Sequence, residues 1–274
     1  MDLHNTKLIC LDMDGTLFST GGVIPDINIR ALKKCVERGI RVAIISGRNQ
    51  LFEAQYGALI APSVILASAN GARIDECAGG RCIFEGFFTP EEMLKKLRIF
   101  ESLDLYFEVY TCRSNYQCRE ELMPPGRKLT IANYIKYGQV HEIGHIPYGS
   151  TEPMEKVYKF VAFAEDETPI RPARAKLDKL GIKHCSSSAR NIEVMPDGVG
   201  KDAALKIIAD YYHIDMKDTM AFGDYTNDTE MLRTAGCGVA MQNGVPEAKA
   251  AAKLIAPLNT EGGVGQILEK YVLS

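Results

Sequence analysis

The sequence has few of the features that would direct it to a membrane, to nucleic acid or to a cysteine-bound metal. Its eight cysteines are dispersed, and no two have the C-x-x-C spacing of a zinc or redox site. Lys and Arg together number 32 and Asp and Glu 35, and the net charge of -3 supplies no basic field for nucleic acid or an anionic membrane. The sequence therefore predicts neither of these partners.

Long apolar runs are also absent. No run approaches the ~20 residues that span a bilayer, and the first residues lack a basic segment followed by a long apolar one. We therefore expect a cytoplasmic protein with reduced thiols. Hydrophobic residues make up 46% of the chain and charged residues 24%, which is typical of a globular protein with a sizeable core. Its 274 residues exceed the usual size of one domain, so we expect two.

Strand and helix patterns alternate at both ends of the chain. Near its start, apolar runs typical of buried strands occur at residues 7–12, 41–46 and 64–67, separated by helical periodicity at 26–38 and 48–56. After residue 200 we expect helices at 201–212, 228–235 and 264–271, and strands at 219–223 and 238–241. This alternation predicts an α/β fold with a doubly wound parallel sheet that is covered by helices on both faces.

The middle of the chain follows a different pattern. Strands are expected at 81–88, 105–113, 157–164 and 191–195, with helices at 90–102 and 169–180. Such an arrangement is typical of a separate α+β unit. We therefore predict a discontinuous core domain, residues 1–80 and 190–274, that is split by an inserted domain, residues 81–189.

Polar side chains stand directly after three of the predicted core strands. Ligands of open parallel sheets bind at the carboxyl ends of the strands, so these side chains are expected at one edge of the sheet. A lysine at the start of a predicted helix joins them, because a helix N-terminus favours an anion. The resulting set comprises Asp12, Asp14, Ser46, Gly47, Arg48, Lys201, Asp224, Asn227 and Asp228.

These residue types suit phosphoryl transfer with a metal. Several carboxylates that share one pocket suggest a hard divalent cation, and oxygen-rich sites with room for water suit Mg²⁺. Lysine and serine then suit a phosphoryl group. Asp12 can attack phosphorus as a nucleophile, while Asp14 can protonate the leaving oxygen and afterwards activate water.

Each of these signals has an ordinary structural explanation when it stands alone. Asp-Gly-Thr is a common turn sequence, Ser46 could be a helix N-cap, and most single lysines are solvated. Asp224 and Asp228 could be acids that cap a helix. The functional interpretation depends on their coincidence, because independent polar groups follow strands that are predicted to be neighbours.

In these motifs the sequence resembles the haloacid dehalogenase superfamily, in particular the Cof-type phosphatases with a type IIB α/β cap. Residues 12–16 (Asp-Met-Asp-Gly-Thr) resemble its first motif, residues 45–48 (Ile-Ser-Gly-Arg) its second, Lys201 its third and residues 223–228 (Gly-Asp-Tyr-Thr-Asn-Asp) its fourth. The resemblance extends through both halves of the core, and the insertion falls where that subclass carries its cap. Gly200 and Asp202 depart from the Ser and Gly that commonly flank the lysine.

The resemblance implies a role for each matched residue. Asp12 would be the nucleophile and Asp14 the acid and then the base, while Ser46 and Lys201 would hold the phosphoryl group. Magnesium would bind to Asp12, to the backbone carbonyl of Asp14 and to Asp224. Asn227 would contact the phosphate, and Asp228 would support the waters of the metal or Lys201. An Asp at position 14 is similar to the phosphatases of the superfamily and unlike its dehalogenases.

A small phosphorylated metabolite is the expected partner, with a sugar phosphate favoured. Arg48, together with Arg190 and Asn191 at the return from the inserted domain, is expected to contact the non-reacting part of the substrate. Transfer of the phosphoryl group to another sugar stays open, as in a mutase. So does a binding protein without turnover, although binding alone requires no acid at position 14.

One competing motif is present. Residues 141–145 (His-Glu-Ile-Gly-His) satisfy H-E-x-x-H, a zinc-protease pattern whose two histidines must share one face of a helix. Gly138, Gly144, Pro147 and Gly149 crowd this segment and disfavour a long helix, and no third ligand is evident. We therefore favour the phosphatase over the metalloprotease.

Overall fold

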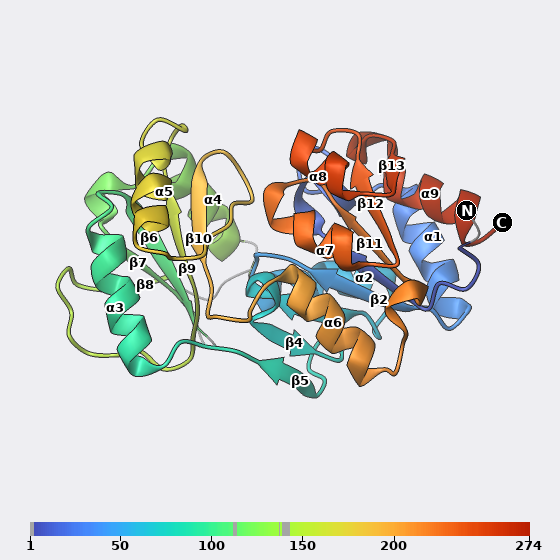
Figure 1. Ribbon diagram of the computed structural model, residues 1–274, viewed down its shortest axis with the longest axis horizontal. Helices are drawn as coiled ribbons and strands as arrows, with labels where there is room; N and C mark the ends of the chain where they lie inside the picture. Colours follow the sequence, from blue (N-terminus) through green and yellow to red (C-terminus); the bar gives the residue numbers. More distant parts are fainter. Residues whose placement is uncertain (1–2, 112–113, 137, 139–142) are drawn as a thin grey trace. The chain divides into compact units, whose positions relative to one another are not determined.

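The structure is a computed structural model that describes residues 3–111, 114–136, 138 and 143–274. The chain forms two compact units, Met1–Glu85 with Gly198–Ser274, and Gly86–Asp197. Within the described part of the chain, no helix is both long enough and apolar enough to cross a membrane. Figure 1 shows both units with their element labels.

The first unit is built on an eight-stranded sheet with the order β13-β12-β11-β1-β2-β3-β4-β5. Neighbouring strands from β13 to β3 are parallel, whereas β4 and β5 run antiparallel. The strands are β1 (Leu8–Leu11), β2 (Arg41–Ile45), β3 (Ile65–Ser68), β4 (Arg73–Asp75), β5 (Cys82–Glu85), β11 (Thr219–Gly223), β12 (Cys237–Met241) and β13 (Leu254–Ala256). The predicted doubly wound α/β fold is confirmed.

Helices cover both faces of this sheet. Side chains such as Leu8, Cys10 and Ile45 are fully buried and point to the face that packs against Leu205 and Leu232 of the helices α6 and α7. On the other face α1 packs beside α9 and against α2 (Figure 1). The helices are α1 (Asp26–Glu37), α2 (Gln50–Ile60), α6 (Lys201–Tyr211), α7 (Thr229–Thr234), α8 (Pro246–Ala251) and α9 (Gly263–Tyr271). Strands buried on both faces explain the continuous apolar runs of the sequence.

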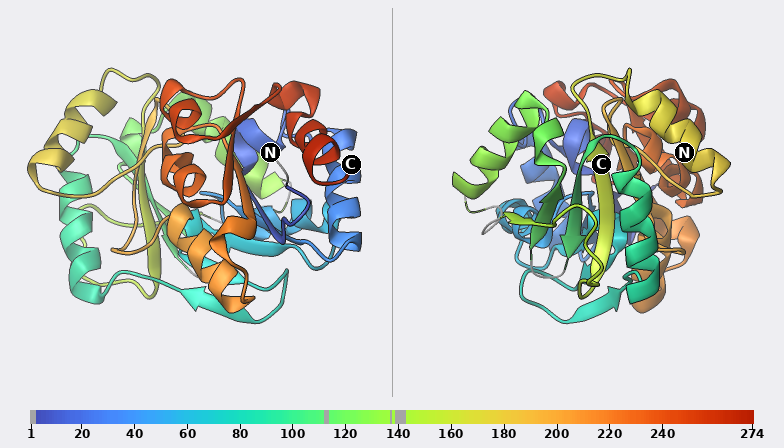
Figure 2. Two further views of the ribbon diagram at one scale, coloured as in Figure 1. Left: turned by 45° about the vertical axis from the view of Figure 1, so that its right-hand side comes forward. Right: turned by 90° about the vertical axis from the view of Figure 1, so that its left-hand side faces the viewer.

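The second unit has a five-stranded sheet with the order β10-β9-β6-β7-β8. Its elements are β6 (Tyr106–Thr111), β7 (Asn115–Cys118), β8 (Ile143–His145), β9 (Val157–Phe163), β10 (Asn191–Val194), α3 (Pro90–Glu101), α4 (Pro125–Lys136) and α5 (Ile170–Lys179). Phe107 and Phe160 of the sheet pack against Phe100 of α3 and Leu177 of α5. The right-hand view of Figure 2 shows α3 and α5 on one side of this sheet and α4 on the other.

Two segments lie in a different unit from the one that the sequence indicated. A strand at residues 81–88 was expected to open the inserted domain. Its first part, β5, instead pairs with β4 at the edge of the first sheet, where Arg73 and Glu85 are cross-strand partners at 3.3 Å, whereas Phe88 pairs with Val157 in the second unit. Residues 190–197 were expected in the core, but β10 pairs with β9 in the second sheet. In both segments the unit is set by the strand with which the segment pairs. The apolar pattern of a short strand does not predict which strand that is.

Candidate active site

The candidate residues of the first unit gather where the central strands end. Strands β11, β1 and β2 are neighbours in the sheet, and they lead directly into Asp224, Asp12 and Ser46. The backbone N–H of Asp12 still bonds to the carbonyl of Phe222, at 3.0 Å, so the first of these loops begins in register with the neighbouring strand. The parallel sheet therefore sets the spacing of the three loops.

Lys201 lies at the centre of this cluster. It is the first residue of α6, and only 2% of its surface is exposed. Its Nζ donates to Asp12 Oδ1 at 2.5 Å and to Asp228 Oδ1 at 2.6 Å. Burial by itself would lower the pKa of Lys201, but the two carboxylates outweigh burial and raise that pKa, so the side chain is a protonated cation.

Asp228 supports both the lysine and the loop that carries Asp224. Its Oδ2 accepts the backbone N–H groups of Asp224 at 2.9 Å and Tyr225 at 3.1 Å, while Oδ1 accepts Lys201. The residue is fully buried. Because both of its oxygens already have donors, Asp228 fits the supporting role better than direct ligation of a metal.

Three carboxylates in this cluster could hold a metal ion. Asp12, Asp224 and Asp228 each offer an oxygen, and these oxygens lie within 4.8 Å of one another. Burial first, and the neighbouring carboxylates next, raise the pKa of Asp12 well above its ordinary value, although Lys201 lowers it. Burial and the charge of Asp228 raise the pKa of Asp224 to about 7. Hard oxygen donors with an excess of negative charge fit a divalent cation.

The loop after β1 is shaped around Asp224. Thr16, which is fully buried, donates its hydroxyl to Asp224 Oδ1 at 2.8 Å. Gly15 has φ +81°, and a Cβ atom there would lie 2.3 Å from Asp224 Oδ2. Glycine is therefore required both by the backbone conformation and by the close approach of the carboxylate.

Asn243 also supports the loop after β1, although the sequence motifs did not include it. Its Nδ2 donates to the carbonyl of Gly15 at 2.8 Å, and its Oδ1 accepts the N–H of Asn259 at 3.1 Å. The signal was present, because Asn243 follows the strand β12 just as the other polar residues follow theirs. Thr16 was noted as part of a motif, but its contact with Asp224 spans 208 positions and has no local signature.

The loop after β2 carries Ser46, Gly47 and Arg48. Ser46 is 1% exposed, its carbonyl accepts the N–H of Asn70 at 2.7 Å, and its hydroxyl accepts the N–H of Arg48 at 3.3 Å. The guanidinium of Arg48 contacts Asp14, at 2.6 Å to each carboxylate oxygen. The structure thus brings Arg48 to Asp14.

Asn227 lies in the turn Thr226–Asp228. Its side-chain oxygen is buried and accepts no hydrogen bond within the part of the chain that the structure describes. A buried amide oxygen normally has a donor, so this atom is suited to a hydrogen-bond donor that reaches the site from outside the chain, such as water.

Arg190 and Asn191 belong to the unit Gly86–Asp197. Asn191 is 4% exposed, and its amide oxygen accepts the N–H groups of Ser187 and Ser188, both at 3.1 Å. Arg190 is exposed. Asn191 therefore shapes the loop that presents Arg190.

The metalloprotease motif falls partly outside the described residues, which do not include His141 and Glu142. Its second histidine, His145, lies on the strand β8, where its Nδ1 is 2.6 Å from Glu120 Oε1. A strand cannot present a histidine pair at helical spacing. The observed position of His145 disfavours the zinc-protease alternative.

A lysine and three carboxylates at the strand ends of a doubly wound sheet define an α/β enzyme with a carboxylate–lysine centre. Residues 9–268 match the sequence model of the haloacid dehalogenase-like hydrolases. The chain belongs to that family.

Known proteins support this assignment. The chain is 30% identical to 5-amino-6-(5-phospho-D-ribitylamino)uracil phosphatase YwtE of Bacillus subtilis, over 97% of this chain and 98% of that protein. A haloacid dehalogenase-like hydrolase structure from B. subtilis has a TM-score of 0.81 and 26% identity, covering 96% of this chain and 99% of that one. A HAD subclass IIB sugar phosphatase, at 24% identity and TM-score 0.78 over 97% and 99% of the two chains, shares the fold. The predicted family and the predicted enzyme class, a phosphatase, are confirmed.

Proposed function

We propose that the chain is a Mg²⁺-dependent phosphatase that hydrolyses a small phosphorylated metabolite through an aspartyl-phosphate on Asp12. The observation that carries this proposal is the buried bridge from Lys201 to Asp12 and Asp228, beside Asp224. Lys201 Nζ lies 2.5 Å from Asp12 Oδ1. The cation that would bind the phosphoryl group is therefore next to the carboxylate that would attack it.

In this reaction an oxygen of Asp12 attacks phosphorus, and the bond from phosphorus to the leaving oxygen breaks. Asp14 donates its proton to that oxygen, and the alcohol departs. Asp14, now a carboxylate, takes a proton from water as the water attacks phosphorus, which releases phosphate and restores Asp12. The Lys201 ammonium, the Ser46 hydroxyl and the amide N–H group of Asn227 donate to the phosphoryl oxygens throughout.

The residues of the cluster fit a divalent cation, with Asp12, Asp224 and the backbone carbonyl of Asp14 as its ligands and Asp228 in support. When bound, Mg²⁺ would neutralise part of the charge of the phosphoryl group. Thr16 and Gly15 serve this function by fixing the position of the Asp224 carboxylate.

For the substrate we propose a sugar phosphate or a closely related polyol phosphate. The relative from B. subtilis is named for a phosphorylated ribityl compound, which belongs to this class. We propose that the unit Gly86–Asp197 serves as the cap and that Arg190, on the loop that Asn191 shapes, contacts the non-reacting part of the substrate.

Transfer to a second sugar is the remaining alternative on the same site. Water and a sugar hydroxyl would be activated by the same carboxylate, Asp14, so the two reactions differ only in the acceptor. An assay with a phosphorylated sugar and an excess of an unphosphorylated acceptor separates them. Free phosphate as the main product supports hydrolysis, whereas a phosphorylated acceptor supports transfer.

The proposed function is tested by a panel of sugar and polyol phosphates after removal of bound metal by chelation. We expect turnover to disappear on chelation and to return with Mg²⁺, because the carboxylates need a hard cation beside the phosphoryl group. Phosphate release is the readout, and casein serves as the control substrate for proteolysis. Restoration by Zn²⁺ but not Mg²⁺, with cleavage of the peptide substrate, would contradict the proposal.

Binding of Mg²⁺ should depend on pH through Asp224. Its folded-state pKa of about 7 lies above its ordinary value of 3.8, so ionisation makes the metal-free protein progressively less stable as pH rises between these values. A cation binds the ionised carboxylate and relieves that penalty. We expect Mg²⁺ to raise the melting temperature little at about pH 5.5 and by several degrees at about pH 8.

The control for this measurement is NaCl at matched ionic strength. In the Asp224→Asn variant the shift should be small at both pH values, because the ionisable ligand is lost. A shift of equal size at both pH values in the wild-type protein, or a full shift in the variant, would refute the assignment of Asp224 as a metal ligand.

A further inference from the structure

The side chain of Arg48 holds that of Asp14 at both oxygens. Arg48 Nε donates to Asp14 Oδ2 and Nη2 to Oδ1, both at 2.6 Å. This two-pronged contact between a planar guanidinium and a carboxylate restricts the direction of the carboxylate as well as its distance. The two residues come from the loops after β2 and β1, so the pair also joins two of the loops that form the site.

Arg48 is itself held by an aromatic group. Its guanidinium lies 3.9 Å from the centre of the Phe52 ring. The Phe52 ring packs against Phe18 and Tyr56, with centroid distances of 6.2 and 5.0 Å. Phe18 directly follows the turn Met13–Leu17 that contains Asp14. The contact between Phe52 and Phe18 therefore connects the ring under Arg48 to the loop that carries Asp14.

This pair is partly exposed to solvent, which screens its charges. The side chain of Asp14 is 53% exposed and that of Arg48 is 23% exposed. Exposed ion pairs contribute little to folding, in contrast to the buried contacts of Lys201. The main effect of the two hydrogen bonds from Arg48 is therefore on the orientation of the exposed Asp14 carboxylate, which they restrict.

We propose that Arg48 is a positioning residue that aims the Asp14 carboxyl group at the leaving oxygen of the substrate. This inference rests on the proposed function, in which Asp14 gives its proton to that oxygen while the phosphorus–oxygen bond breaks. It changes the role that the sequence suggested for Arg48, which was a contact with the non-reacting part of the substrate.

The proposal is tested by comparing two leaving groups. The p-nitrophenolate of p-nitrophenyl phosphate leaves without a proton, whereas the alkoxide of the best alkyl phosphate from the panel requires one. The readout is the ratio of kcat/KM for the alkyl phosphate to kcat/KM for p-nitrophenyl phosphate, relative to the ratio of the wild-type enzyme. A general loss of folded protein cancels in this ratio.

For Asp14→Asn we expect the ratio to fall by about 100-fold or more, the usual contribution of a general acid. For Arg48→Met we expect a fall of about tenfold or more, because the acid is present but no longer aimed. Arg48→Lys keeps the charge without the planar fork and should lie between Arg48→Met and the wild type. Phe52→Leu removes the platform and should lower the ratio in the same direction.

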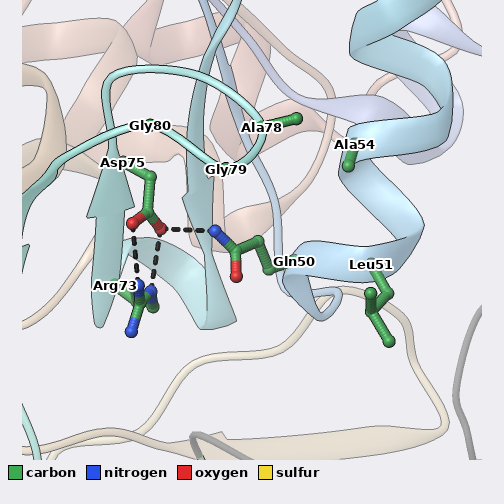
Figure 3. Close-up of a pocket in the computed structure, with 8 residues that line it drawn as sticks. All are labelled: Gln50, Leu51, Ala54, Arg73, Asp75, Ala78, Gly79 and Gly80. Atoms are coloured by element: carbon green, nitrogen blue, oxygen red, sulfur yellow. Dashed lines mark hydrogen bonds and ion pairs between the residues drawn. The ribbon is translucent and has the colours of Figure 1, made fainter.

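The matched control is Arg73→Lys. Figure 3 shows Arg73 with two dashed contacts to Asp75, and these measure 2.8 and 2.9 Å in the same unit of the chain. Asp75 is fully buried, so this variant should lower the melting temperature. It should leave the leaving-group ratio unchanged, because the pair has no part in the proposed reaction.

Each failure has a distinct signature. An unchanged ratio in the Arg48 variants, with a fall in Asp14→Asn, would overturn the positioning role and keep the proposed function. A rise in KM for particular sugar phosphates with the ratio otherwise retained would return Arg48 to substrate contact. An unchanged ratio in Asp14→Asn would remove the acid role of Asp14 and with it this part of the proposed function.

Discussion

The Asp12→Asn variant is expected to lose turnover by about 1,000-fold or more, because an amide cannot serve as the nucleophile. The fold should persist. The amide oxygen can still accept a hydrogen bond from Lys201, which also keeps its contact with Asp228. Removing one of several buried carboxylates also relieves the repulsion that raises the pKa of Asp12. Phosphate release and thermal melting together measure the two effects.

The control for this variant is Asp215→Asn, which changes an exposed aspartate paired with Lys217. It should leave both turnover and melting temperature near those of the wild type. Substantial residual turnover in Asp12→Asn, above the level that contaminating enzyme explains, would show that Asp12 is not the nucleophile.

The Lys201→Met variant is expected to lose both activity and stability. Methionine cannot hold the phosphoryl group, so turnover should fall by about 1,000-fold or more. The substitution also leaves Asp12 and Asp228 buried without their cation, at a cost of about 3–5 kcal/mol in the free energy of unfolding. The loss should be greater at high pH, because burial raises the pKa of Asp12 and the ionised Asp12 then lacks its cation. Chemical denaturation at two pH values measures it.

A second variant separates the two losses. Lys201→Met combined with Asp228→Asn removes one uncompensated charge and should recover part of the stability without recovering turnover. Lys206→Met, at an exposed position of the same helix, should change neither. Recovery of turnover in the double variant would contradict the role of Lys201 in holding the phosphoryl group.

The sequence predicted the sheet and its site because both follow from local patterns. Apolar runs mark the buried strands β1, β2 and β11, and the polar residue after each strand reaches the same edge because the strands are parallel neighbours. The lysine at the start of α6 was found by the same reasoning. These inferences need only strand ends and helix starts.

Elements without a strong local pattern were missed. Helix α4 buries none of its residues, so it has no apolar face whose periodicity could reveal it. Strand β4 has three residues, too few for an alternation to be recognised. The start of α2 was expected at residue 48, but the Asn49 side chain caps the helix by accepting the N–H of Phe52, which leaves Arg48 outside the helix.

Contacts between distant side chains were also beyond the sequence. The pairing of Arg48 with Asp14 and the hydrogen bond from Thr16 to Asp224 join separate loops. The position of Arg48 also depends on the Phe52 ring, which packs against Phe18, and no motif records this packing. The residue types of a site are therefore easier to predict than the way in which they orient one another.

The covalent intermediate is tested most directly by the stereochemical course at phosphorus. A substrate whose phosphoryl group is chiral through sulfur and two oxygen isotopes is hydrolysed in water enriched in the third oxygen isotope, and the configuration of the released thiophosphate is determined. Attack by Asp12 and then by water makes two in-line displacements, each of which inverts phosphorus, so the account predicts net retention. Net inversion would show a single displacement by water and would contradict the aspartyl-phosphate.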